Sequence, residues 1–214
     1  MDWPLFAGLK EETRRDVLAR TRRRRFDRKQ ALFYEGDPSD GMHLVASGWV
    51  AVRVSTPLGD VATVAVVGPQ EPLGEQSLLG DHDRRSASAI ALSPVESLYL
   101  SRTDFDELRE FDPSVDRFLA GLFNDRLRRT SARLLEALYI PTPQRVLRRL
   151  TEVAETFGDD GVIPLTQEDM ATLAGTTRPT VNRTLRKAEE AGALSLARGR
   201  IRILDVSVLA RLAH

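Results

Sequence analysis

The sequence predicts an α+β fold in which a domain of short strands is followed by one long helix and then by a small helical domain that ends in a hairpin. Three observations predict it. Short β-branched segments separated by turn residues run from about Phe26 to Ser101. A helical stripe of apolar residues then follows Asp112. Two prolines within residues 140–143 interrupt that helix, and new helical patterns follow them.

The composition is that of an ordinary globular protein. The chain has 214 residues, of which 42% are hydrophobic and 29% charged, and its formal net charge is zero. No apolar run reaches the roughly 20 residues that span a bilayer, and residues 1–9 lack the basic-then-apolar layout of a signal peptide. We therefore expect a cytoplasmic protein without a membrane partner.

The content of cysteine and histidine limits the chemistry. The chain has no cysteine, which removes disulfides, thiolate metal sites and a cysteine nucleophile. His43, His82 and His214 lie far apart and form no metal-binding spacing, so we expect no metal site. A Ser-His-Asp triad is not excluded, but no pattern such as GxSxG indicates one, and we expect no enzyme.

The first half predicts a jelly-roll-like β-roll within residues 1–111. A short helix is expected over residues 5–19. Polar and apolar residues then alternate over residues 48–54, a turn follows at residues 56–60, and the β-branched run Val61–Val67 comes next. Short strands at this spacing are typical of barrels and rolls.

A long helix is predicted over residues 112–139. Asp112 and Pro113 are typical of a helix start, and apolar residues recur at Val115, Phe118, Leu122, Leu127, Leu134 and Leu138. The stripe is longer than packing on one domain requires, which predicts dimerisation against a second copy; the alternative is a helix that packs only on its own domain. Residues 140–143 are the predicted hinge, and residues 144–214 the second domain.

Residues 165–204 predict a winged helix-turn-helix. Thr166 followed by acidic residues is typical of a helix start, and Gly175 ends that short helix. Thr177 begins a second helix that runs to about Glu190, with Pro179 in its first turn. Two short strands over residues 193–197 and 200–204 then form the predicted wing.

The second helix carries polar residues at its start, where a helix in a major groove presents side chains to base edges. A solvated basic face is the alternative, but the caps and the wing favour DNA. The candidate DNA-binding residues are Thr166, Gln167, Thr177, Arg178, Pro179, Thr180, Asn182, Arg183 and Arg186, with Arg198 and Arg200 on the wing.

Residues 165–205 resemble the C-terminal domain of the cAMP receptor protein/FNR family of bacterial regulators. The N-terminal half resembles the cyclic-nucleotide-binding β-roll of that family, on residues 35–37, 42–54 and 73–88. The resemblance covers nearly the whole chain. It implies an N-terminal cyclic-nucleotide-binding β-roll, a long dimerisation helix and a C-terminal winged helix-turn-helix.

The segment that begins at Leu73 resembles the phosphate-binding cassette of the family. A glycine turn allows close approach of the ligand, and an arginine provides a fork for a phosphate. The resemblance implies that Gly74 and Glu75 bind the ribose and that Arg85 and Ser86 bind the phosphate, with Ala87 beside them.

Residues 126–131 resemble the stretch where cAMP-responsive members place a Thr-Ser pair against the adenine. The resemblance implies that Thr130 contacts the base within the subunit and that Ser131 reaches the ligand of the partner subunit. The alternative is a polar layer that sets the register of two paired helices.

Two residues depart from the family pattern. Gln76 stands where the cassette is usually apolar, and Pro179 stands where several members carry a glutamate that helps to read bases. We expect a DNA half-site related to the familiar one but not identical. The lack of cysteine argues against the iron–sulfur branch, and His82 is interpreted as a solvated loop residue and not as a haem ligand.

The sequence thus predicts a homodimeric transcription regulator gated by cAMP or a related cyclic nucleotide. Its other partners would be double-stranded DNA with a roughly palindromic operator, and RNA polymerase if it is an activator. Two alternatives stay open: a regulator with a vestigial or different ligand pocket that binds DNA constitutively, which Gln76 favours, and a cyclic-nucleotide-binding module that acts through protein partners.

Overall fold

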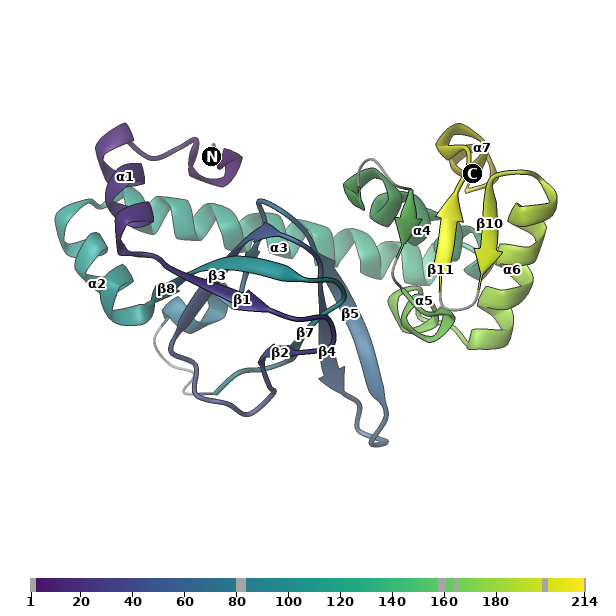
Figure 1. The fold of residues 1–214 in the computed structure, drawn as a ribbon, viewed down its shortest axis with the longest axis horizontal. Coiled ribbons are helices and arrows are strands. Elements are labelled where there is room, and N and C mark those ends of the chain that lie inside the picture. The colour runs from purple at the N-terminus through teal and green to yellow at the C-terminus, as the bar shows by residue number, and fades with distance from the viewer. Residues whose placement is uncertain (1–2, 80–83, 158–160, 164, 198–199, 214) are drawn as a thin grey trace. The chain divides into compact units, whose positions relative to one another are not determined.

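The computed structural model describes residues 3–79, 84–157, 161–163, 165–197 and 200–213 (Figure 1). The chain divides into two compact units by its internal contacts. The first consists of residues 1–54 and 67–129, and the second of residues 55–66 and 130–214. None of the helices in the described ranges is long and apolar enough to cross a bilayer.

Two four-stranded antiparallel sheets form the predicted β-roll. One has the order β1 (Arg22–Phe26), β8 (Val95–Ser101), β3 (Gly41–Ser47) and β6 (Pro72–Leu73). The other has the order β2 (Ala31–Phe33), β7 (Ser88–Ala91), β4 (Val50–Ser55) and β5 (Val61–Val67). The mixed helix-and-sheet fold with an N-terminal β-roll is confirmed.

The helices of the first unit differ in part from the prediction. The helix expected over residues 5–19 is a 3-10 turn, Pro4–Phe6, followed by α1 (Glu11–Arg20). A further helix, α2 (Arg102–Phe111), was not predicted; the Ser101 hydroxyl caps it by accepting a hydrogen bond from the Asp104 N–H at 3.1 Å. Helix α2 has only ten residues and buries two of them, Phe105 and Leu108.

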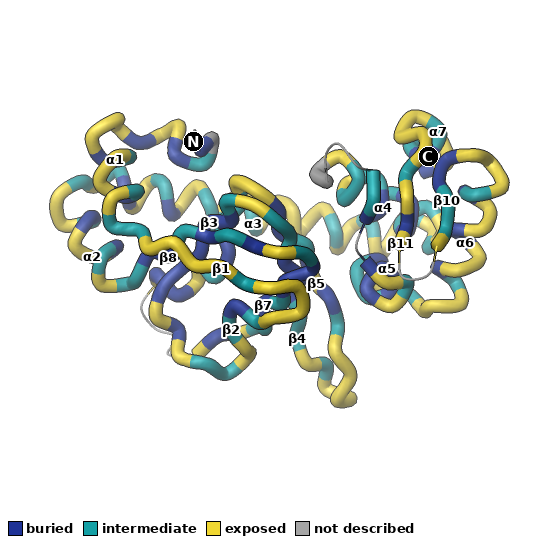
Figure 2. The backbone as a smooth tube through the Cα atoms, in the orientation of Figure 1, coloured by how far each residue is buried: buried dark blue, intermediate teal, exposed yellow. Residues whose placement is uncertain are grey.

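The first strand begins at Arg22, four residues earlier than the sequence suggests. Four consecutive arginines, which look like a solvated loop, make up most of β1. They are tolerated because β1 is an edge strand: it is almost wholly exposed, while β3 in the middle of the sheet is buried (Figure 2).

The hydrophobic core of the first unit lies between the roll and the helices. It contains Trp3, Phe6, Met42, Leu44, Leu78, Leu100 and Phe105, together with Val115 and Leu119 from the start of the long helix.

The long helix α3 spans Ser114–Tyr139 (Figure 1). Asp112 is the C-cap of α2, so α3 begins two residues later than the sequence suggests. Beyond its first turns the helix exposes large apolar side chains in this single chain, namely Leu127, Leu134, Leu135, Leu138 and Tyr139. An exposed apolar row of this length is typical of an interaction surface.

The second unit contains the predicted winged helix-turn-helix. Its helices are α4 (Thr142–Phe157), α5 (Gln167–Leu173), α6 (Arg178–Glu190) and α7 (Val206–Leu212). Its sheet has the order β10 (Leu194–Ala197), β11 (Arg200–Ile203) and β9 (Val162–Ile163). The first helix begins at Thr142, not Gln144, because Pro143 fits in a first turn that needs no N–H partner. Strand β9 and helix α7 were not predicted.

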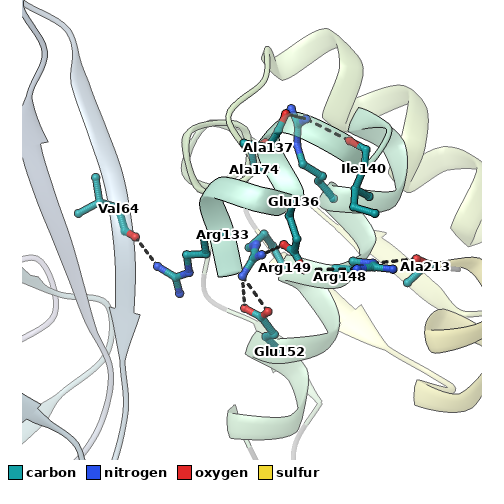
Figure 3. A network of polar contacts seen from close by, with 11 residues as sticks. Val64, Arg133, Glu136, Ala137, Ile140, Arg148, Arg149, Glu152, Ala174 and Ala213 are labelled. Atoms are coloured by element: carbon teal, nitrogen blue, oxygen red, sulfur yellow. Dashed lines mark hydrogen bonds and ion pairs between the residues drawn. The ribbon is translucent and has the colours of Figure 1, made fainter. Parts of the chain in front are cut away.

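Arginines join the end of α3 to α4 and to the helix-turn-helix (Figure 3). Arg145 donates to the carbonyl oxygens of Ala137 at 3.0 Å and Ile140 at 3.2 Å, and to those of Ala174 and Gly175, both at 3.2 Å. Arg145 therefore forms hydrogen bonds both to the end of α3 and to the turn between α5 and α6.

A second contact fixes the same junction. The buried Arg149 side chain pairs with Glu136 on α3 and with Glu152 on its own helix (Figure 3). Arg148 lies 3.4 Å from the same Glu136 carboxylate. Two residues, Ile140 and Pro141, thus separate two helices that are tied together by side chains.

Candidate functional site

A cavity of about 440 Å³ opens in the first unit. It is lined by Phe33, Ser39, Val52, Leu73, Gly74, Glu75, Gln76, Ser77, Arg84, Arg85, Ser86, Ala87 and Arg126. Five of the seven residues predicted to bind a ligand are in this set: Gly74, Glu75, Arg85, Ser86 and Ala87. The fold therefore brings the predicted cassette together around one space.

Gly74 forms the turn at the start of the cassette. Its φ of +77° lies in the left-handed region, and an added Cβ would lie 2.6 Å from Nη1 of Arg85. The short 3-10 helix η2 (Glu75–Leu79) follows at once, and the Ser77 hydroxyl donates to the Gly74 carbonyl oxygen at 2.7 Å. Glycine is favoured here because this φ is rarely adopted by other residues, and an added Cβ would also displace the Arg85 guanidinium.

Arg85 is a buried cation at the wall of the cavity, with its side chain only 4% exposed. Its Nη2 donates to Asp40 Oδ1 at 3.0 Å, and its Nη1 donates to Ser77 Oγ and to the Gly74 carbonyl oxygen. The guanidinium also lies over the Phe33 ring, 4.2 Å from its centroid.

Within the described ranges, one N–H group of this guanidinium has no hydrogen-bond acceptor. The buried Nε of Arg85 has no hydrogen-bond partner among the described residues. Burial lowers the pKa of Arg85 and the charge of Asp40 opposes that effect, but a guanidinium stays charged in a protein. A buried charge with an unpartnered donor beside a cavity fits an anionic ligand.

The other polar groups of the cavity have defined partners. The Ser86 hydroxyl donates to Gln76 Oε1 at 2.8 Å. The buried Glu75 carboxylate lies 4.0 Å from Nε of Arg126, which comes from α3. The neighbouring Arg84 is exposed and donates to the Gly36 carbonyl oxygen at 2.7 Å, whereas Arg85 is buried.

The predicted Thr-Ser pair lies outside this set. Thr130 and Ser131 are exposed on α3, one helical turn beyond Arg126, and do not line the cavity. Their contact with a ligand stays a prediction.

Four residues that contact Arg85 or Glu75 were missed from the sequence: Phe33, Asp40, Ser77 and Arg126. Arg126 lies in the stretch that resembles the family, but no role could be assigned to it because its partner Glu75 is 51 positions away in the chain. The other three contact Arg85 only because β2, the residue before β3 and η2 fold next to it.

His43 is a core residue near this site. It is buried, its Nδ1 lies 2.9 Å from Ser97 Oγ, and its ring packs against those of Phe26, Phe33 and Tyr99. Burial, reinforced by the charge of Arg85, lowers its pKa to about 3. The ring is therefore neutral at ordinary pH. His82 and His214 lie outside the described residues.

A second candidate site lies on α6. Val181 and Leu185 are buried against the domain core, and the opposite face exposes Arg178, Pro179, Asn182, Arg183 and Arg186. These residues border a surface hollow with Gln167, Lys187 and Glu190. The helix thus presents a basic face at its N-terminal half, as the sequence predicts.

The helix before it is held by its cap. The Thr166 side chain accepts from the Asp169 N–H at 3.1 Å, and Asp169 accepts in return from the Thr166 N–H at 3.1 Å, which is a capping box. Gln167 then accepts from Asn182 Nδ2 at 3.2 Å. By contrast, Thr177 occupies the N-cap of α6 without a cap bond, and its hydroxyl lies 3.2 Å from that of Thr180.

The wing adds further basic side chains. Strands β10 and β11 are antiparallel, and Arg200 and Arg202 are exposed on β11. Arg198, also predicted to contact DNA, lies outside the described residues.

These two sites define a class of protein: a DNA-binding regulator with a cyclic-nucleotide-binding domain. The family model "Cyclic nucleotide-binding domain" matches residues 23–111, and the model "Crp-like helix-turn-helix domain" matches residues 144–212.

Similar proteins give the same result. The cyclic AMP receptor protein of Thermus thermophilus is 35% identical over 98% of this chain and 96% of its own length. The CRP-like cAMP-activated global transcriptional regulator of Mycobacterium tuberculosis is 31% identical over 88% of this chain and 87% of its own length. The chain belongs to the cAMP receptor protein/FNR family of bacterial transcription regulators. The members of that family are regulators, not enzymes.

Solved structures agree with the fold. The catabolite activator protein of Thermus thermophilus is 34% identical, covers 98% of each chain and gives a TM-score of 0.57. The c-di-GMP responsive regulator CLP of Xanthomonas campestris is 20% identical over 91% of this chain and 99% of its own, with a TM-score of 0.74, which shows a likeness of fold alone.

Proposed function

We propose that this protein is a homodimeric transcription regulator whose effector is cAMP and whose target is a roughly palindromic double-stranded DNA operator. The observation that carries the effector assignment is the buried Arg85 guanidinium, which lines the cavity together with Gly74 and Ser86 and whose Nε–H has no partner among the described residues. The names of the relatives from Thermus thermophilus and Mycobacterium tuberculosis, both of which mention cAMP, support the choice of nucleotide.

Each residue of the cassette has a role in this proposal. Arg85, Ser86 and Ala87 bind the cyclic phosphate, and Gly74 and Glu75 bind the ribose. Arg126 offsets the charge of Glu75, which would otherwise repel the phosphate, and leaves the carboxylate as an acceptor for a hydroxyl. Thr130 and Ser131 bind the adenine, with Ser131 acting across the dimer.

The exposed row of α3 supports the dimer. Leu127, Leu134, Leu135 and Leu138 recur at helical spacing and are all more than half exposed in the single chain. In a dimer of this kind two recognition helices read major grooves about 34 Å apart on one face of the DNA. We also propose a cytoplasmic location, a contact with RNA polymerase if the protein activates, and domains over residues 1–111, 112–139, 140–143 and 144–214.

On the DNA side we assign base reading to Arg178 and Arg183 at the start of α6, with Pro179 altering the preferred half-site. Contacts to the DNA backbone and to further bases are assigned to Thr166, Gln167, Thr177, Thr180, Asn182, Arg186, Arg198 and Arg200.

The proposal is tested by measuring DNA binding with cAMP, with cGMP and without a nucleotide, on duplexes selected from a random pool. We expect cAMP to raise the affinity for the selected DNA. Equal binding in all three conditions would favour a constitutive regulator with a vestigial pocket. A larger effect of cGMP would favour another nucleotide, and weak binding without steep salt dependence would favour a module that acts through proteins.

Replacing Arg183 with alanine should weaken binding to the selected DNA by about 1–3 kcal/mol, because a bidentate contact to guanine is lost. Binding to random duplex should change little. Fluorescence anisotropy with both duplexes measures the difference, and Arg211→Ala on the exposed face of α7 is the matched control. An equal loss on both duplexes would identify Arg183 as a phosphate contact.

A further inference from the structure

Gln76 is the residue of the cassette that departs from the family pattern, and the structure shows what it contacts. It lies on η2, is exposed to the cavity, and its Oε1 accepts a hydrogen bond from the Ser86 hydroxyl at 2.8 Å. An apolar side chain at this position could not make that bond. Gln76 thus acts directly on a residue assigned to the cyclic phosphate.

This contact has a consequence for ligand binding. A serine hydroxyl has a single hydrogen, so the hydroxyl that donates to Gln76 cannot donate to a phosphate oxygen at the same time. An anion that needs the Ser86 hydrogen must therefore compete with Gln76 for it. With a fixed acceptor at position 76, Ser86 would offer the anion only lone pairs.

A side-chain amide is not a fixed acceptor. Its oxygen and its NH₂ group have nearly the same shape, and rotation about the last bond exchanges them. Once turned, Gln76 donates to the Ser86 oxygen, and the Ser86 hydrogen becomes available to the cavity. The reversed bond would thus link the Gln76 amide, the Ser86 hydroxyl and a phosphate oxygen in one chain of donors and acceptors.

The two neighbouring arginines already have other hydrogen-bond partners. Arg84 is directed to the Gly36 carbonyl oxygen, and Nη1 and Nη2 of Arg85 are engaged by Gly74, Ser77 and Asp40. Within the part of the chain that the structure describes, the Ser86 hydroxyl donates to Gln76.

We propose that Gln76 is a ligand-positioning residue, whose side-chain amide turns over when the cyclic phosphate binds and then donates to Ser86, which donates in turn to a phosphate oxygen. The inference rests on the proposed cyclic-nucleotide site and deepens it. It replaces the interpretation of Gln76 as a sign of a vestigial pocket.

The test is calorimetric titration of the full-length protein with cAMP, for the wild type, Gln76→Leu, Gln76→Glu, Ser86→Ala and the double variant Gln76→Leu/Ser86→Ala. Loss of the donor in Gln76→Leu should weaken binding about three- to tenfold. Gln76→Glu can only accept from Ser86 and adds a charge next to the anion, so the loss should exceed about thirtyfold.

The double variant isolates the relay. If Gln76 acts through Ser86, removing it in the Ser86→Ala background should cost less than about twofold, because the coupling is already gone. Gln30→Glu is the matched control, since it makes the same change in the first unit at a side chain whose oxygen accepts from the Asp27 N–H. We expect wild-type affinity for that control.

Three results would overturn the inference: unchanged or tighter binding by Gln76→Leu, additive losses in the double variant, or equal losses in Gln76→Glu and Gln30→Glu. Failure of the wild type to bind cAMP, with cGMP titrated in parallel, would instead refute the proposed effector. Since Gln76 is exposed, thermal unfolding at the wild-type temperature should confirm that each variant is folded.

Discussion

Replacing Arg85 with leucine is expected to weaken cAMP binding by at least about a hundredfold, because the phosphate loses a charge-assisted donor in a buried site. The side chain is only 4% exposed, and its Nε has no partner among the described residues. Water therefore cannot replace the guanidinium easily. Isothermal calorimetry on the full-length protein measures the loss.

The neighbouring arginine provides the control. Arg84→Leu removes the same charge one position away, but Arg84 is exposed and donates to a backbone carbonyl group. We expect its affinity for cAMP to stay within about threefold of the wild type, as befits an exposed charge in high dielectric. Near-normal affinity in Arg85→Leu, or equal losses in the two variants, would contradict the assignment of the phosphate to Arg85.

Replacing Arg145 with alanine is expected to lower the free energy of unfolding of the DNA-binding unit by about 2–3 kcal/mol, because several partly buried hydrogen bonds are lost together. Its guanidinium donates to the carbonyl oxygens of Ala137, Ile140, Ala174 and Gly175 (Figure 3 shows the surroundings). Ala137 is in the last turn of α3 and Ile140 directly follows that helix, where carbonyl groups lack helical partners and a cation is favourable.

The same substitution should also affect DNA binding. Ala174 and Gly175 precede α6, so loss of their common donor should loosen the turn that presents the recognition helix. We expect urea unfolding to show the loss of stability, and anisotropy titration below the unfolding transition to show weaker binding of selected DNA. Unchanged stability in Arg145→Ala, with Arg211→Ala as the reference, would show that solvent satisfies these carbonyl groups equally well.

Elements with a local signal could be predicted from the sequence. Three such features are found at their predicted positions: the capping box of Thr166, the first-turn proline of α6 and the β-branched run of β5. Their signals depend on neighbours within a few positions, where sterics and hydrogen bonds act directly on the backbone. The start of β1 and strand β9 were missed because pairing with distant strands decides them. Helices α2 and α7 do have local signals, the caps Ser101 and Asp205, which the sequence prediction overlooked.

The residues of the cassette could be predicted from the sequence, but most of their contacts could not. By itself the sequence determined that Gly74, Arg85 and Ser86 belong to one site, since their spacing resembles that of a known cassette. Only the tertiary structure showed that Asp40, Ser77 and Phe33 hold the guanidinium, that Arg126 pairs with Glu75, and that Gln76 bonds to Ser86. These contacts join residues on separate strands and helices, and their distances depend on how the chain packs, which no local pattern records.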